Sequence, residues 1–100
     1  MQEHLRVAET LRSIINERTS KVIFLTELID LLQDRIYGQF LDSNELKRII
    51  ASICRILPGW CRIMTIPKGW VLRCVGKERL QIGEIKAAIT SHFSKQEEAQ

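Results

Sequence analysis

The amino-acid sequence predicts one small α+β domain, in which helices precede and follow a β-hairpin. Apolar residues recur at helical spacing in four segments, and two alternating runs flank a short turn that contains proline and glycine. The length of 100 residues suits a single domain with its own core. We assign the domain to residues 1–93 and expect residues 94–100 to form a flexible tail.

The first part of the chain predicts a helix, a short extended segment and a second helix. Amphipathic spacing indicates a first helix over about Glu3–Glu17, and the β-branched segment Lys21–Phe24 favours a short strand or an extended linker. The second helix is expected over roughly Glu27–Tyr37. Thr26 would be its N-cap, and Gly38 would supply the left-handed residue that stops it.

A third helix is predicted by a capping box at its start. The Asp42 carboxylate can accept a hydrogen bond from the Glu45 amide while the Glu45 side chain reaches back, and Pro58 and Gly59 end the helix. Its apolar face comprises Leu46, Ile49, Ile50, Ile53 and Leu57. We expect these residues to form the core with Trp60, Ile63, Leu72, Ile85 and Ile89.

Two alternating runs, residues 61–66 and 70–75, predict a hairpin around Pro67-Lys68-Gly69. If Pro67 and Lys68 form a two-residue turn, Arg62 lies opposite Arg73, and the cysteines at 61 and 74 also face each other. A four-residue loop would shift the pairing but leave both arginines on one face. Like charges directly opposite each other on two strands destabilise the sheet by about 0.2–1 kcal/mol, unless solvent screens them or an acidic partner neutralises them.

The last helix closes the domain. Its apolar stripe comprises Ile82, Ile85, Ala88, Ile89 and Phe93. The order helix, short strand, helix, helix, hairpin, helix is that of a winged helix-turn-helix with an additional C-terminal helix.

The composition excludes several classes of protein. No apolar run approaches the ~20 residues of a membrane span, and residues 1–11 do not resemble a signal peptide. We therefore expect an intracellular protein. Three cysteines are an odd number without zinc-site spacing, which argues against a disulfide framework or a metal site, so we expect reduced thiols. His4 and His92 lie near apolar stripes, and no nucleophile–base pair or phosphate loop is present. We therefore expect no catalytic residues, no metal and no cofactor, and hence no enzyme.

The charge is unevenly distributed, although the whole chain carries only +3. Residues 1–42 contain five basic and seven acidic side chains, whereas residues 43–95 contain ten basic and three acidic ones. This asymmetry indicates either an acidic partner for the second half or a solvated basic face. The candidate partner-binding residues are those on the exposed side of the third helix and the outer face of the hairpin: Lys47, Arg48, Arg55, Arg62 and Arg73.

Nearly the whole chain resembles one family, the C-terminal winged-helix domain of the eukaryotic DNA-replication licensing factor (the Double-parked family, the geminin-regulated loader of the MCM helicase). The similarity lies in the order and spacing of short segments: Leu11-Arg12-Ser13 with Glu17-Arg18, the helix from Leu25, Glu45, Leu57-Pro58 with Trp60, Ile63 and Ile66, and Ile85 with Ala87. Two positions depart from the family. Gly59 stands where an acidic residue is usual, and Asp42-Ser43 replaces a proline-led cap.

The resemblance implies a nuclear, non-catalytic domain that binds the MCM complex as it is loaded onto origins with the origin recognition complex. The short basic segment that precedes this domain in the family is absent, so we expect the chain to be a fragment, monomeric in isolation. The alternative is a DNA-binding winged helix that contacts duplex DNA through the third helix and wing. That helix offers only Asn44, Lys47, Arg48 and Arg55, and the wing only Lys68, so non-specific DNA contact should be weak.

Overall fold

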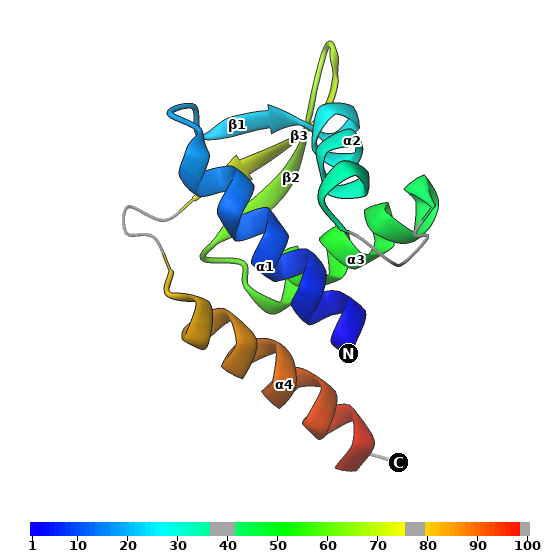
Figure 1. The fold of residues 1–100 in the computed structure, drawn as a ribbon, viewed down its shortest axis with the longest axis vertical. Helices are drawn as coiled ribbons and strands as arrows, with labels where there is room; N and C mark the ends of the chain where they lie inside the picture. The colour runs from blue at the N-terminus through cyan, green and yellow to red at the C-terminus, as the bar shows by residue number, and fades with distance from the viewer. Residues whose placement is uncertain (37–41, 76–79, 99–100) are drawn as a thin grey trace.

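The computed structural model describes residues 1–36, 42–75 and 80–98. In chain order its elements are α1 (Gln2–Glu17), β1 (Val22–Phe24), α2 (Leu25–Arg35), α3 (Ser43–Ile56), β2 (Cys61–Ile66), β3 (Gly69–Cys74) and α4 (Ile82–Glu98), as Figure 1 shows. This is an α+β domain in which the last helix follows a three-stranded antiparallel sheet. The layout is consistent with a winged helix, as the sequence predicts.

Helix α1 and strand β1 form where they are expected. Helix α1 buries one stripe of its surface through Val7, Ala8, Leu11 and Ile14, which is the amphipathic pattern that predicts it. The segment after it is a strand, because Val22–Phe24 pairs antiparallel with β3. The open choice between strand and linker is thereby resolved.

The predicted start of the second helix is wrong. Helix α2 begins at Leu25, its N-cap is Phe24, and no side chain caps it, so Thr26 lies inside the first turn. The physical reason is that Phe24 is still paired with Val71 in the sheet, so the chain passes from strand to helix without a loop. The predicted end at Tyr37 is also wrong, because α2 ends at Arg35 and its C-cap Ile36 is already extended; Gly38, the expected stop, lies outside the described residues.

Helix α3 begins at the predicted cap. The Asp42 Oδ1 atom accepts a hydrogen bond from the Glu45 amide at 2.8 Å, which satisfies one of the free N–H groups of the first turn. The second bond of a capping box, in which the Glu45 carboxylate would accept from the Asp42 amide, is not formed between these two described residues. The helix ends at Ile56, with Leu57 as its C-cap, directly before Pro58.

The sheet has the strand order β1-β3-β2, with a two-residue turn between β2 and β3. Arg62 therefore lies opposite Arg73, and Cys61 opposite Cys74, as the two-residue alternative predicts. Strand β3 starts one residue early, at Gly69. The backbone of Gly69 has φ of +136°, a conformation that side chains strongly disfavour.

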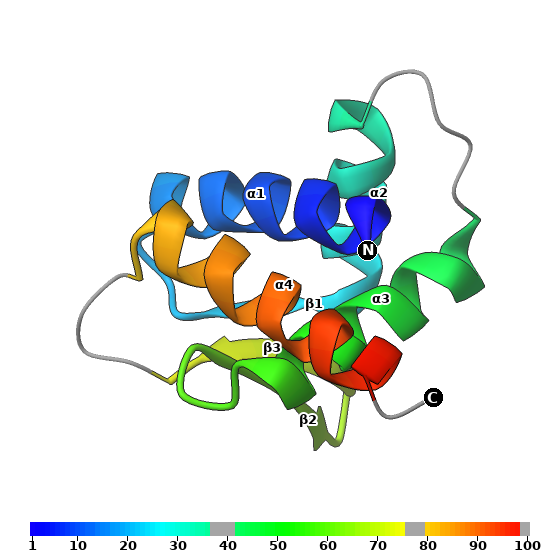
Figure 2. The ribbon, with the colours of Figure 1, turned by 90° about the horizontal axis from the view of Figure 1, so that it is seen from below.

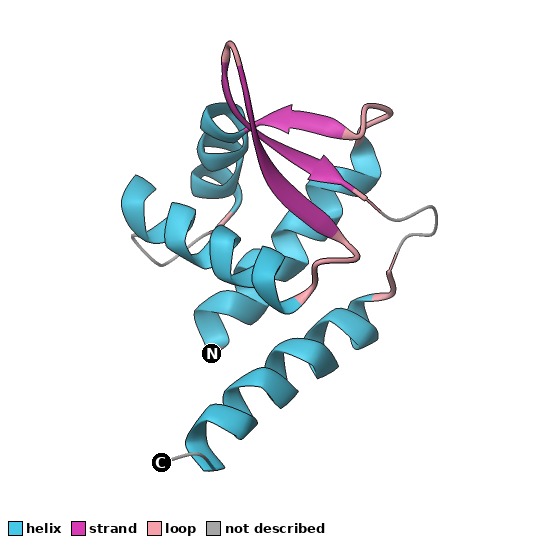
Figure 3. Ribbon diagram, turned by 180° about the vertical axis from the view of Figure 1, so that it is seen from behind, coloured by secondary structure: helices cyan, strands magenta, loops and turns pink. Residues whose placement is uncertain are grey.

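The core lies between the helices and one face of the sheet. Helix α1 lies in front of the sheet in Figure 1, and in the reverse view of Figure 3 the strands lie in front of α1. Helices α1 and α4 run side by side, as Figure 2 shows. The predicted core residues Leu46, Ile49, Ile50, Ile53, Trp60, Leu72, Ile85 and Ile89 are all buried. Leu57 and Ile63 are only partly buried, because they pack at the margin of the core.

Helix α4 continues beyond Phe93 to Glu98. The backbone of the segment assigned to a tail is therefore helical as far as Glu98, and its flexibility stays a prediction.

Candidate interaction surface

The five basic residues predicted to bind a partner are all exposed, but they fall into two groups on different elements. Lys47, Arg48 and Arg55 project from α3. Arg62 and Arg73 project from the sheet, directly opposite each other on β2 and β3.

On α3 the cations lie outside the buried stripe. Arg48 and Arg55 are seven residues apart, two helical turns, and so share one exposed face, while Lys47 lies on the flank. Asp42 and Glu45 stand at the opposite end of the helix from Arg55, which is in its last turn. This arrangement is favourable for the helix dipole, so Arg55 also has a structural role.

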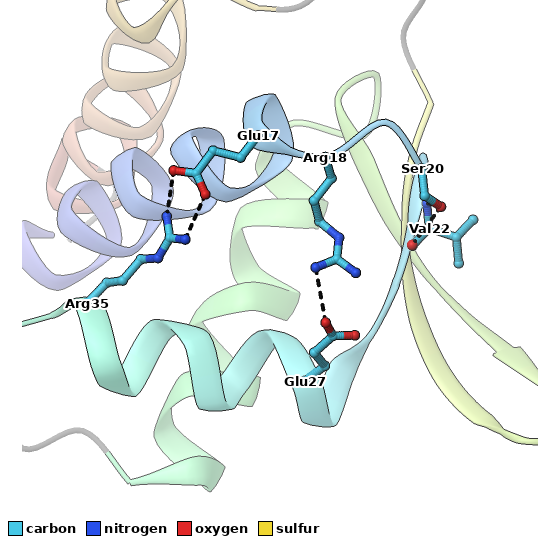
Figure 4. A network of polar contacts seen from close by, with 6 residues as sticks. All are labelled: Glu17, Arg18, Ser20, Val22, Glu27 and Arg35. Carbon is cyan, nitrogen blue, oxygen red and sulfur yellow. Dashed lines mark hydrogen bonds and ion pairs between the residues drawn. The ribbon is translucent and has the colours of Figure 1, made fainter.

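The ion pairs recorded among the described residues involve other elements. Arg35 donates two hydrogen bonds, of 3.0 and 2.7 Å, to the Glu17 carboxylate, and Arg18 donates one of 3.0 Å to Glu27; Figure 4 shows both contacts. These pairs join α1 and its following loop to α2, and the two-bond contact lowers the pKa of Glu17 below its usual value. A third pair joins Lys86 of α4 to Glu9 of α1 at 3.6 Å.

In contrast, none of the five candidate cations has an ion pair or side-chain hydrogen bond with another described residue. These five positive charges on α3 and on the sheet thus have no compensating acidic side chain in the part of the chain that the structure describes. An acidic partner would find these groups available.

Strand pairing reveals residues that sequence reasoning did not assign to the site. The inward face of the sheet carries the buried Ile23, Cys61 and Leu72, so the alternate positions must point away from the helices. We call this opposite side the outer face. Its exposed members are Val22, Phe24, Arg62, Met64 and Arg73, and the buried Val71 lies between them on β3. Alternation alone places Met64 beside Arg62, but Phe24 joins this face only because β1 pairs with β3.

The turn of the hairpin adds a further exposed aromatic residue. Trp70 is 58% exposed, whereas Trp60 is buried in the core, as expected for Trp60. Lys68 at the turn is the one described basic residue of the wing tip. The tip is therefore more apolar than basic.

Arg55 contributes to a separate cleft. The cleft has a volume of about 420 Å³ and is lined by His4, Ser52, Arg55, Ile56, His92 and Phe93, from α1, α3 and α4. The His4 ring meets the Phe93 ring edge-on at a centroid distance of 4.8 Å. Partial burial, helped by the nearby chain-terminal amine and His92, lowers the pKa of His4, although Glu3 opposes the shift. His4 therefore adds little positive charge at neutral pH.

The cysteines lie at the base of the hairpin and on α3: Cys61 begins β2, Cys74 ends β3, and Cys54 is in the last turns of α3. The sulfur atoms of Cys54 and Cys61 are 3.5 Å apart, and Cys61 is fully buried. Its hydrogen bond to Cys54 and its burial both raise the pKa of the Cys61 thiol. Cys61 is thus a packing residue, and nucleophilic chemistry is disfavoured there.

Among the residues that the structure describes, no group of His, Cys, Asp and Glu side chains is arranged to hold a metal ion. Nor is any helix in this part of the chain long and apolar enough to cross a membrane. No protein-family model matches the sequence, and a search of curated proteins also found no match.

Proposed function

We propose that this chain is a winged-helix domain that serves as a non-catalytic docking module for the MCM helicase during the licensing of replication origins. The partner is inferred from the sequence resemblance to the licensing-factor family. The element order and the hairpin register support the winged-helix assignment.

The observation that carries a docking function is the set of uncompensated cations. Five exposed basic side chains on α3 and the sheet have no acidic partner among the described residues, whereas Arg18, Arg35 and Lys86 are paired. Such a surface attracts an acidic partner at long range and orients it at short range. It requires no catalytic group.

The surroundings of Arg62 and Arg73 favour a protein over DNA. Surfaces that bind duplex DNA are polar and strongly positive. The outer face of the sheet instead exposes Phe24 and Met64 beside the arginines, and the wing tip exposes Trp70. Exposed aromatic residues, methionine and arginine together are typical of protein interfaces.

The test is a binding assay with the purified domain. We expect it to bind the MCM complex, and one separated MCM subunit in preference to the others, with an affinity that decreases as salt increases. A duplex DNA of mixed sequence is titrated in parallel. Absence of MCM binding, or tight and sequence-selective DNA binding without it, would show that the proposed function is wrong.

A further inference from the structure

The outer face of the sheet is organised in two rows that run across the strands. One row is Val22, Arg73 and Arg62, taken in the order β1, β3, β2. The next row is Phe24, Val71 and Met64, in the same order. A basic row therefore lies beside an apolar row, two residues away along each strand, or about 7 Å.

The apolar row is a small cluster separate from the main core. Val71 is only 2% exposed, yet it does not belong to the core cluster, because it points away from the helices. Its cross-strand neighbours Phe24 and Met64 are 40% and 39% exposed. Val22, at the end of the basic row, is 40% exposed as well. Val71 at the centre of this cluster is therefore shielded from solvent, whereas its neighbours at the edge remain exposed.

The basic row carries a local repulsion that a ligand would relieve. Arg62 and Arg73 face each other across β2 and β3, and neither has an acidic partner among the described residues. Two like charges directly opposite one another on a sheet are destabilising. A carboxylate placed between them would satisfy both guanidinium groups and could bond one of them through two oxygens.

We propose that the outer face of the sheet is the docking surface of the domain, and that its occupant is an acidic, amphipathic segment of the partner protein. Apolar side chains of the segment cover Phe24, Val71 and Met64, and its carboxylates engage Arg62 and Arg73. This inference rests on the proposed function, since it names the kind of segment by which the MCM complex is recognised.

The dimensions of the face suit a helix lying across the strands. Three strands spaced by about 4.8 Å span about 10 Å, which equals seven residues of α-helix at 1.5 Å each. A helix with apolar residues at i, i+4 and i+7 would follow the apolar row. Acidic residues one helical row away would stand over the arginines.

The first experiment measures the affinity of the whole domain for the purified MCM complex by titration calorimetry. Two variants address the two rows separately: Arg62→Glu with Arg73→Glu, and Met64→Glu alone. Each places carboxylates on the face without altering a residue of the main core. We expect at least tenfold weaker binding from each, because the new charges repel the acidic segment and interrupt its apolar contact.

The matched control is Arg6→Glu with Lys95→Glu. Both residues are exposed on helices, and the double variant changes the net charge by the same amount as the arginine pair. We expect a change of less than about threefold. Circular dichroism of every variant checks that the fold is retained. An equal loss in the control would mean that net charge or the helical side determines binding, and the docking surface would be misplaced.

The second experiment identifies the occupant directly. A photo-crosslinking amino acid replaces Met64, the domain is irradiated with the MCM complex, and the joined peptide is identified by mass spectrometry. We expect an acidic peptide with apolar residues at helical spacing. A basic peptide, a peptide without carboxylates or a second copy of this chain would overturn the inference.

The two levels of the hypothesis fail in different ways. If the unaltered domain does not bind the MCM complex, the proposed function fails and the inference fails with it. If the unaltered domain binds but both outer-face variants bind equally well, the function stands and the assignment of the outer face is wrong.

Discussion

At the level of single residues, apolar packing holds this domain together. No polar or charged residue is buried in the described part of the chain, and the recorded ion pairs join exposed side chains. Exposed ion pairs contribute about 0–1 kcal/mol each. A fully buried aliphatic side chain contributes about 1.5–3 kcal/mol. The stability of the fold therefore depends on residues such as Ile50, which is 0% exposed at the centre of the α3 stripe.

Replacing Ile50 with alanine should lower the free energy of unfolding by about 2–5 kcal/mol, since it empties a site that neighbouring side chains can fill only in part. The measurement is urea unfolding followed by circular dichroism. Arg48→Ala on the exposed face of the same helix is the control, and its effect should stay within about 0.5 kcal/mol. A loss below about 1 kcal/mol for Ile50→Ala would mean that α3 presents a different face to the core.

At the level of secondary structure, the sequence predicts elements well where local chemistry decides them. The apolar stripes, the Asp42 cap and the two-residue turn depend on residues close together in the chain, and each is found in the structure. The start of α2 depends on the pairing of Phe24 with Val71, which are far apart in sequence. Thr26 could not be excluded as a cap without knowledge of that pairing.

The cap of α3 gives a test of one such local interaction. Asp42→Ala removes the acceptor of the 2.8 Å bond from the Glu45 amide and should cost about 0.5–2 kcal/mol of stability. Asp42→Asn keeps an acceptor and should recover most of the loss, because asparagine is also a strong N-cap. Urea unfolding of the three proteins measures both effects. Equal stability of the alanine and asparagine variants would show that the cap is not what fixes the start of the helix.

At the level of the whole molecule, the charge asymmetry read from the sequence becomes a difference between two sides. Three ion pairs, Glu17–Arg35, Arg18–Glu27 and Glu9–Lys86, connect α1 and its C-cap to α2 and α4, whereas the five candidate cations of α3 and the sheet are not paired with described residues. The sequence places Arg62 and Arg73 on one face, but it does not reveal the apolar neighbour Phe24. The order of strands in a sheet is a property of the complete fold, so this part of the candidate site required the structure.

Lys47 and Arg48 lie on α3, outside the two rows of the outer face, so under the proposed docking we expect them to act differently from Arg62 and Arg73. Charges at the margin of an interface mainly accelerate association, and salt screens them over about 8 Å at physiological ionic strength. Lys47→Glu with Arg48→Glu should leave the fold intact, because both side chains are exposed and lie outside the buried stripe. It should slow association with the MCM complex several-fold at low salt, with little change in the rate of dissociation.

Stopped-flow kinetics at low and high salt measure this effect, and the Arg6→Glu with Lys95→Glu variant again matches the change in net charge. The deficit of the α3 variant should shrink as salt is added, since the lost contribution is long-range attraction. A deficit that persists at high salt and appears in the dissociation rate would place Lys47 and Arg48 in direct contact with the partner. Normal kinetics for the α3 variant, together with failure of the helical-side control, would move the working surface to α1 and α4.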